Sequence, residues 1–320
     1  MLDNANPLTH NISMNRLSSE KRAAVVSALV EGNSIRATCR MTGVAKNTVT
    51  KLLVDLGTAC SIAQDNLMRD LSCERVECDE IWAFVYAKQR NVPVERQADP
   101  TIGDVWTWVG MDSDTKLVIS YRIGPRDFPE ARAFMQDLAS RLRHRVQLTT
   151  DGHRPYLKAV REAFGKQVDY AQLVKIYGNE PKGDTRYSPA VCLGAEKYVA
   201  SGNPDPDKIS TSYVERQNLT MRMSMRRFTR LTNAFSKKVE NLAAAVSLHF
   251  AYYNLCRPHS SLGKGITPAM AAGVTDHVWT LPELIGLLES AEATPTKRGR
   301  YAKTREKRMN TAAQPPELSK

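Results

Sequence analysis

The stretch Val76-Glu-Cys-Asp-Glu-Ile-Trp-Ala-Phe-Val-Tyr86 carries the clearest strand signal in the chain. It is rich in β-branched and aromatic residues, which favour an extended conformation within a sheet. Asp79 lies inside this apolar run, where a carboxylate without a partner is costly. A surface charge on an edge strand is the alternative, but the apolar neighbours favour a functional acid.

The elements around this strand follow a definite order. Strand patterns continue at 105–112, 117–123, 146–150 and 168–176, and helical patterns are found at 129–143, 155–164 and from 211 onward. Three strands, helix, strand, helix, strand, helix is the order of an RNase H-like domain. We therefore expect an α/β fold with an RNase H-like mixed five-stranded sheet flanked by helices.

Two further acids lie where this fold would bring them to Asp79. Asp151 follows the fourth strand, which lies beside the middle of the first strand in such a sheet. Glu215 lies in the first turn of a helix that can cross the open edge of the sheet. Asp151-Gly152 could instead be a simple turn, and Ser212-x-x-Glu215 could be a capping box.

Other acids compete for the same role. Glu80, Asp104 and Asp112 are the rivals. A regular strand would point Glu80 to the face opposite Asp79, and the other two fall at strand ends. The expected catalytic and metal-binding set is therefore Asp79, Asp151 and Glu215. Such carboxylates suit two Mg²⁺ ions, with Mn²⁺ able to substitute, and a two-metal site cleaves phosphodiesters.

The charge of the chain points to a polyanionic partner. Its net charge is +11, and nucleic acid is the commonest acidic partner of such a protein. No Asp or Glu occurs between 216 and 238, and we expect four cations of this run to contact DNA: Arg222, Arg226, Arg227 and Arg230. Arg222 lies two helical turns after Glu215 and on the same face; a solvated cation is the alternative. His153 could contact DNA or merely cover a helix start.

Residues 16–57 have the pattern of a helix-turn-helix. Gly43 would form the turn, and Val44, Val49 and Leu52 would form the apolar seam beneath the third helix. The outward-facing residues at the start of this third helix would read a major groove: Lys46, Asn47, Thr48 and Lys51. A three-helix packing module without DNA contact is the alternative.

The predicted boundaries divide the chain into six segments. They are a flexible N-terminus (1–15), the helix-turn-helix domain (16–57), a helical connector (58–75), the RNase H-like catalytic domain (76–255, with an insertion at 178–209), a C-terminal helical extension (256–294) and a basic disordered tail (295–320). Neither a secretory signal nor a membrane helix is expected. The six cysteines form no C-x-x-C pair. We expect a cytoplasmic, nucleoid-associated protein.

Several of these strings together resemble insertion sequence 1 family transposases. They are Cys78-Asp-Glu-Ile-Trp, Thr149-Thr-Asp-Gly, Val214-Glu-Arg-Gln-Asn-Leu-Thr-Met-Arg and Arg230-Leu-Thr-Asn-Ala-Phe-Ser-Lys-Lys. The similarity runs from about residue 76 to 255. It implies a DDE transposase whose acids are Asp79, Asp151 and Glu215, with Arg222 as the basic residue after the glutamate.

The resemblance also implies partners and a reaction. Such enzymes need Mg²⁺, bind the terminal inverted repeats of their element through a helix-turn-helix, and act on paired ends as dimers or higher multimers. Members often carry an N-terminal zinc-finger-like segment, for which this chain has no suitable cysteines. We expect hydrolytic cleavage of DNA, followed by joining of the 3′-hydroxyl to target DNA. An RNase H-like nuclease without strand transfer, or an inactive helix-turn-helix regulator, remains the alternative.

Overall fold

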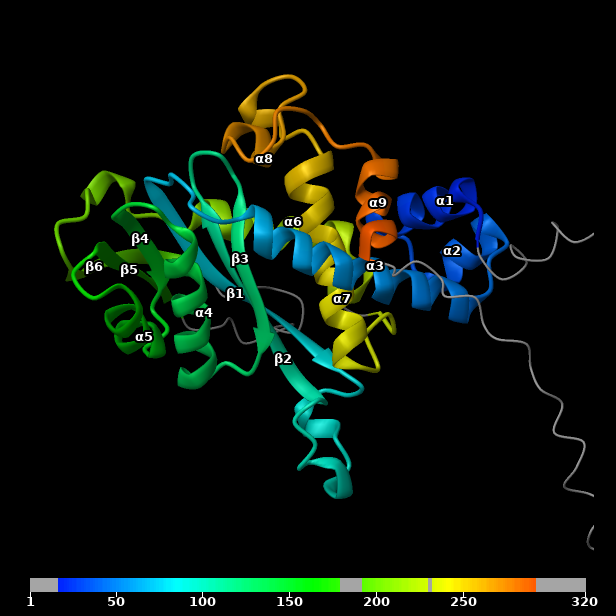
Figure 1. Cartoon of the computed structure of the whole chain (residues 1–320). Helices are drawn as coiled ribbons and strands as arrows, with labels where there is room; N and C mark the ends of the chain where they lie inside the picture. Colours follow the sequence, from blue (N-terminus) through cyan, green and yellow to red (C-terminus); the bar gives the residue numbers. More distant parts are fainter. Residues whose placement is uncertain (1–16, 179–191, 230–231, 292–320) are drawn as a thin grey trace, which may run out of the picture.

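A mixed sheet forms the centre of the molecule (Figure 1). The computed structural model describes residues 17–178, 192–229 and 232–291. In this part of the chain the sheet has six strands in the order β3-β2-β1-β4-β5-β6. The strands are β1 (Arg75–Val85), β2 (Gly103–Asp112), β3 (Val118–Gly124), β4 (Val146–Asp151), β5 (Val168–Tyr177) and β6 (Cys192–Ser201). The first three strands are an antiparallel meander, and β4 and β5 run parallel to β1. This is the RNase H-like topology that the sequence predicts.

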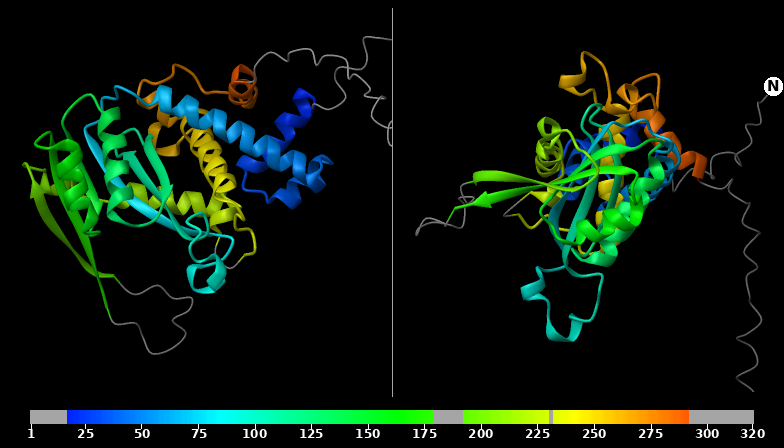
Figure 2. Two further views of the ribbon diagram at one scale, coloured as in Figure 1. Left: turned by 60° about the horizontal axis from the view of Figure 1, so that its bottom comes forward. Right: turned by 90° about the vertical axis from the view of Figure 1, so that its left-hand side faces the viewer.

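The predicted strand number was one too low. The sixth strand, β6, lies in the 178–209 stretch, which we interpreted as an inserted loop, and it pairs antiparallel with β5. Nearly all of its residues are exposed, so the sequence has no alternation of buried and exposed positions there. Figure 2 shows β5 and β6 extending away from the rest of the sheet. The strand is therefore held by backbone pairing rather than by an apolar face.

Helices cover both faces of the sheet. They are α1 (Ser19–Val30), α2 (Ile35–Thr42), α3 (Lys46–Leu67), α4 (Phe128–Arg141), α5 (Pro155–Phe164), α6 (Ser212–Ser224), α7 (Val239–Ala251), α8 (Pro268–Ala271) and α9 (Leu281–Ala291). One apolar cluster joins the sheet to α4 and α5, with Trp108 and Phe134 buried in it. A second cluster joins the other face to α3, α7 and α9, around Leu56, Ile81 and Val246. Among the described helices, none combines the length and apolar composition needed to cross a bilayer.

The three N-terminal helices share a core with the sheet. Ser18 and Ser34 cap α1 and α2, and Gly43 ends α2 in the left-handed region with φ 69°. The third helix, α3, then continues without a break to Leu67 and packs on α7. At the crossing, a Cβ on Gly57 would lie 2.2 Å from the carbonyl oxygen of Ala244. The two backbones are therefore in direct contact.

We predict that Gly57→Ala destabilises the fold. The added methyl group must push α3 and α7 apart, and overpacking of a core typically costs about 1–3 kcal/mol. Urea unfolding followed by circular dichroism measures this cost. Gly286→Ala is the matched control, because a Cβ there meets nothing within 4 Å and alanine favours a helix. Equal stability of the two variants would contradict the close crossing.

A buried histidine makes the fold sensitive to acid. His249 on α7 is 5% exposed, and its Nε2 has no hydrogen-bond partner. Burial lowers the pKa of His249 to about 3, and the nearby Arg257 acts in the same direction. Between about pH 6.5, the ordinary value, and pH 3, the unfolded chain binds a proton that the folded chain does not. His249 therefore favours unfolding increasingly as the pH falls through this window.

We predict that His249→Leu reduces the acid sensitivity of the fold. The free energy of unfolding should fall less between pH 7 and pH 4.5 than in the unchanged chain. The difference is bounded by about 1.4 kcal/mol for each pH unit that the titration crosses. Urea titrations at the two pH values measure it, and parallel losses in both proteins would exclude His249 as the cause.

Candidate active site

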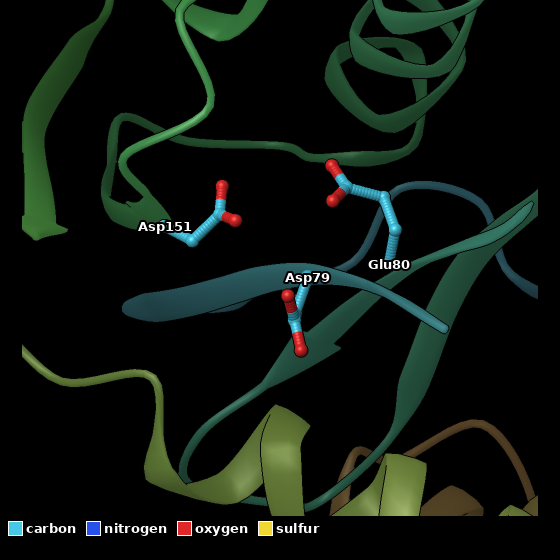
Figure 3. Close-up of side chains that lie close together, drawn as sticks. All are labelled: Asp79, Glu80 and Asp151. Atoms are coloured by element: carbon cyan, nitrogen blue, oxygen red, sulfur yellow. The ribbon is translucent and has the colours of Figure 1, made fainter. Parts of the chain in front are cut away.

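The site is built on the pairing of β1 with β4. These strands run parallel, with Cys78 opposite Thr150, so the next residues, Asp79 and Asp151, are neighbours. Asp79, Glu80 and Asp151 each offer a carboxylate oxygen, and these oxygens all lie within 4.8 Å of one another. Figure 3 shows Asp79 and Glu80 pointing to opposite sides of β1, with Asp151 facing the space beside them. Three acids thus meet where two strands lie side by side.

Glu80 belongs to this group, although sequence reasoning set it aside. It does point away from Asp79, as predicted, but Asp151 at the end of β4 is close to both acids. The Glu80 side chain is 1% exposed, and it interacts with Arg126 and with the buried hydroxyl of Tyr156. Burial raises the pKa of Glu80 to about 8, and the negative charge of Asp151 adds to this effect. An additional cation in the site would stabilise its ionised form.

Asp79 faces helix α6. Its Oδ2 accepts a hydrogen bond from Nδ2 of Asn218, at 2.8 Å. Burial raises the pKa of Asp79 to about 6, with a second contribution from Asp151 and a smaller one from Glu215. Asn218 lies one helical turn after Glu215, so the same helix presents both residues to the site. Sequence analysis missed Asn218, because its partner is remote along the chain.

Two cations already accompany the acids. Arg126, in the loop before α4, donates from Nη2 to Asp151 Oδ2 at 2.9 Å and from Nε to Glu80 Oε2 at 3.1 Å. Lys175 on β5 donates from Nζ to both carboxylate oxygens of Glu215. These ion pairs relieve part of the repulsion among the acids.

Glu215 lies in the same pocket but stands apart from the other acids. The pocket has a volume of about 770 Å³, and its lining includes Asp79, Glu80, Asp151, Glu215, Arg126, Lys175 and Arg222. Glu215 is not among the three residues whose oxygens lie within 4.8 Å. Besides Lys175, it accepts a hydrogen bond from the hydroxyl of Thr211 at 2.6 Å. Thr211 is also the N-cap of α6, so the capping box with Ser212 does not form.

A buried acid fixes the start of α6. Oε2 of Glu77 accepts hydrogen bonds from the backbone N–H groups of Tyr213 and Val214, at 2.8 and 3.0 Å. These are orphan donors at the positive end of the helix dipole, where a carboxylate is stabilising. Glu77 is only 3% exposed, and burial raises its pKa. Because Glu215 directly follows Val214, this contact positions Glu215 over the pocket.

The cations expected to contact DNA are arranged differently from one another. Arg222 lines the pocket, and Arg226 is exposed beyond the end of α6. Arg227 is turned inward and donates to the hydroxyl of Ser236 at 2.7 Å, and burial lowers the pKa of Arg227 to about 10. Arg230 lies outside the described residues.

The expected recognition residues lie far from the pocket. Lys46, Asn47, Thr48 and Lys51 are all exposed at the start of α3. Lys51 also pairs with Asp55 one turn later. Figure 1 places this end of α3 on the opposite side of the molecule from β4, β5 and β6. His153, by contrast, lines the pocket; its backbone N–H donates to Asp151 at 3.0 Å, and its ring packs edge-on against Tyr156.

The donor set suits a hard divalent cation. Carboxylate oxygens at this spacing are ligands that Mg²⁺ or Mn²⁺ accept. Burial, and next the negative charge of Asp151, raises the pKa of Asp79 and of Glu80, so a bound cation would stabilise their ionised forms. Asp79, Glu80 and Asp151 could hold one ion directly. Glu215 could join them only after it gives up Lys175.

Comparisons with known proteins found similar solved structures but no similar sequences. Scans against protein-family models and against curated proteins gave no match. A Mos1 transposase paired-end complex with the left transposon end aligns at 15% identity and TM-score 0.22, over 48% of this chain and 60% of that chain. The Mos1 strand transfer complex aligns at 15% identity and TM-score 0.30, over 88% and 82%. A piggyBac transposase synaptic complex with hairpin DNA aligns at 11% identity and TM-score 0.32, over 88% and 75%. With TM-scores this low, only this chain's own residues carry evidence of its function.

We predict that Glu77→Ala destabilises the fold and weakens metal binding. Two backbone N–H groups at the start of α6, one of them buried, would lose their acceptor, which costs about 1–3 kcal/mol, and Glu215 would lose its support. Urea unfolding and calorimetric titration with Mn²⁺ measure the two effects. Glu74→Ala, which removes an exposed acid on the same segment, is the control. If both variants behave alike, Glu77 does not hold α6.

Proposed function

We propose that this chain is a metal-dependent DNA transposase of the DDE type, similar to the insertion sequence 1 family. One observation carries the proposal: three carboxylates meet on adjacent strands of an RNase H-like sheet, in a pocket that Glu215 also lines. The surrounding cations and the net charge of +11 make a polyanion the natural substrate. Asp79, Glu80 and Asp151 are half-buried like charges that repel one another, and a bound cation would offset this cost.

The acids would hold the catalytic metal. Asp79 and Asp151, together with Glu80, would bind one divalent ion, and Glu215 would complete a second position across the pocket. Mg²⁺ is the expected ion, with Mn²⁺ able to substitute. When bound, such a pair of ions activates the attacking oxygen and stabilises the leaving oxygen of a phosphodiester. Asn218 orients Asp79 through its amide, and Glu77 orients Glu215 through the helix start.

The cations of the pocket would hold the DNA backbone. Arg222, Arg126 and Lys175 line the same pocket as the acids and can neutralise phosphate. Arg226, exposed at the end of α6, extends this cationic surface. At the far end of α3, Lys46, Asn47, Thr48 and Lys51 would read the terminal repeats of an element. Water would cleave the element end, and the released 3′-hydroxyl would then attack target DNA, with two or more copies of the chain on paired ends.

Two other functions share part of this geometry. A nuclease with the same fold would cleave DNA without joining it to a target. A regulator with inactive acids would bind DNA and neither bind Mn²⁺ nor cleave. A strand-transfer assay separates the first from a transposase, and Mn²⁺ titration separates the second. The close approach of Asp79, Glu80 and Asp151, in a pocket that Glu215 also lines, supports a working metal site over a relic.

We predict that Asp79→Asn and Glu215→Gln abolish Mg²⁺-dependent nicking while DNA binding persists. Removing an outer-shell partner typically costs about 10–100-fold in metal affinity or activity, so loss of a direct ligand should cost more. Nicking of a labelled duplex and Mn²⁺ affinity by calorimetry are the two measurements. Glu74→Gln is the control, since this exposed acid lies outside the pocket. Nicking at an unchanged rate by either variant would refute the assignment.

A further inference from the structure

A row of aromatic side chains leads away from the acid pocket along β1. Trp82 and Phe84 follow Glu80 on the same face of the strand, and Phe235 from the segment before α7 packs against Phe84. The ring centroids are 5.7 Å apart for Trp82 and Phe84, and 4.7 Å apart for Phe84 and Phe235. All three side chains are only half-buried. We call these three residues the aromatic row.

The aromatic row is fixed in place by the backbone. Ser236 forms a β-bridge with Val85, and its carbonyl accepts the N–H of Tyr86 at 2.8 Å. The hydroxyl of Ser236 also receives the inward-turned guanidinium of Arg227. These contacts hold Phe235 on Phe84, so the row exists without a ligand. A preformed surface binds with less loss of entropy than one that must assemble.

Cations accompany the aromatic row. Tyr86, with φ 66°, reverses the chain after β1, and Lys88 then places Nζ 5.6 Å from the centre of the Trp82 ring. Lys237 and Lys238 follow Phe235 and are exposed. Asp104 lies opposite Phe84 in the pairing of β1 with β2 and accepts the N–H of Gln89 at 3.0 Å. The surface therefore combines flat apolar rings with positive charge.

This combination matches one class of ligand. Unpaired nucleobases stack on aromatic rings, while cations beside the rings contact the phosphates of the same strand. Trp82 lies two residues beyond Glu80, roughly 7 Å along the strand. A DNA strand that leaves the acid pocket along β1 would meet Trp82 next. A paired duplex cannot use these rings, because its bases are already stacked on each other.

We propose that the aromatic row binds unpaired bases of the DNA strand whose backbone crosses the acid pocket. The proposal rests on the proposed function and adds to it a preference for frayed or single-stranded DNA at the reacting end. The rings stack on the bases, and Lys88, Lys237 and Lys238 neutralise the adjoining phosphates. No metal is needed for this binding, so it can be measured apart from any chemistry.

The test uses the full chain in EDTA, so that no cleavage occurs. Fluorescence anisotropy compares a fully paired duplex with the same duplex carrying a short single-stranded 3′ extension that contains 2-aminopurine. The unchanged chain should bind the extended DNA more tightly and alter the 2-aminopurine emission. Trp82→Leu keeps an apolar side chain but removes the ring, and should reduce the advantage of the extension by about 5- to 150-fold, the range for loss of one stacked base.

Control variants separate the possible causes. Tyr198→Leu removes an exposed ring from β6, far from the row in sequence, and should leave the advantage unchanged. If Trp82→Leu is misfolded by circular dichroism, Phe235→Leu, outside the strand, provides the same comparison. The proposal is overturned if a folded variant still prefers the extended DNA as strongly as the original chain does. It is also overturned if the original chain shows no such preference. The proposal is also overturned if the aromatic row serves self-association instead. In that case light scattering would give Trp82→Leu a lower mass than the unchanged chain, while the tighter binding of the extended DNA would persist. Failure to bind either DNA would instead count against the proposed function itself.

Discussion

The parallel pairing of β1 with β4 is the constraint on which the site depends. It places Asp79, in the middle of one strand, beside Asp151, at the end of the other. Successive residues of β1 then serve different neighbours. Glu77 and Asp79 face α6, whereas Glu80 faces the opposite side and Trp82 continues that side beyond the pocket. A shift of this pairing by one residue would exchange the two faces and separate every group in the site.

The site gathers four carboxylates in one pocket. Asp79, Glu80 and Asp151 are forced together by the backbone, and burial raises the pKa of the first two. Arg126 and Lys175 relieve part of the repulsion by pairing with Asp151, Glu80 and Glu215. The same two cations could contact phosphate once divalent ions take over the acids. The repulsion among the carboxylates is thus concentrated in the pocket, where metal ions and DNA bound together would offset it.

The sequence predicted the order of elements and most of their bounds, because buried strands and amphipathic helices have periodic patterns. It also predicted the meeting of Asp79 and Asp151, which follows from topology. It could not predict β6, because that strand has no buried face. Glu77 and Asn218 were missed because their partners lie far along the chain.

Side-chain direction was the other limit of sequence reasoning. The alternation of a strand correctly placed Glu80 opposite Asp79, yet gave no sign that Asp151 would be near both. Among the cations, residue type alone did not show that Arg227 turns inward to Ser236 while Arg226 remains exposed. The bond between Lys175 and Glu215 likewise depends on the register of β5 and the position of α6.

The continuous helix α3 fixes the distance between its exposed N-terminal end and the sheet. It runs from the exposed residues near Lys46 to Leu67 and is locked to α7 where Gly57 meets Ala244. At 1.5 Å per residue, this rod is roughly 33 Å long. Residues at its outer end are therefore held at a constant span and rotation from the sheet. The distance between the acids and any ligand bound at the first turn of α3 is therefore set by a rigid helix and not by a flexible linker.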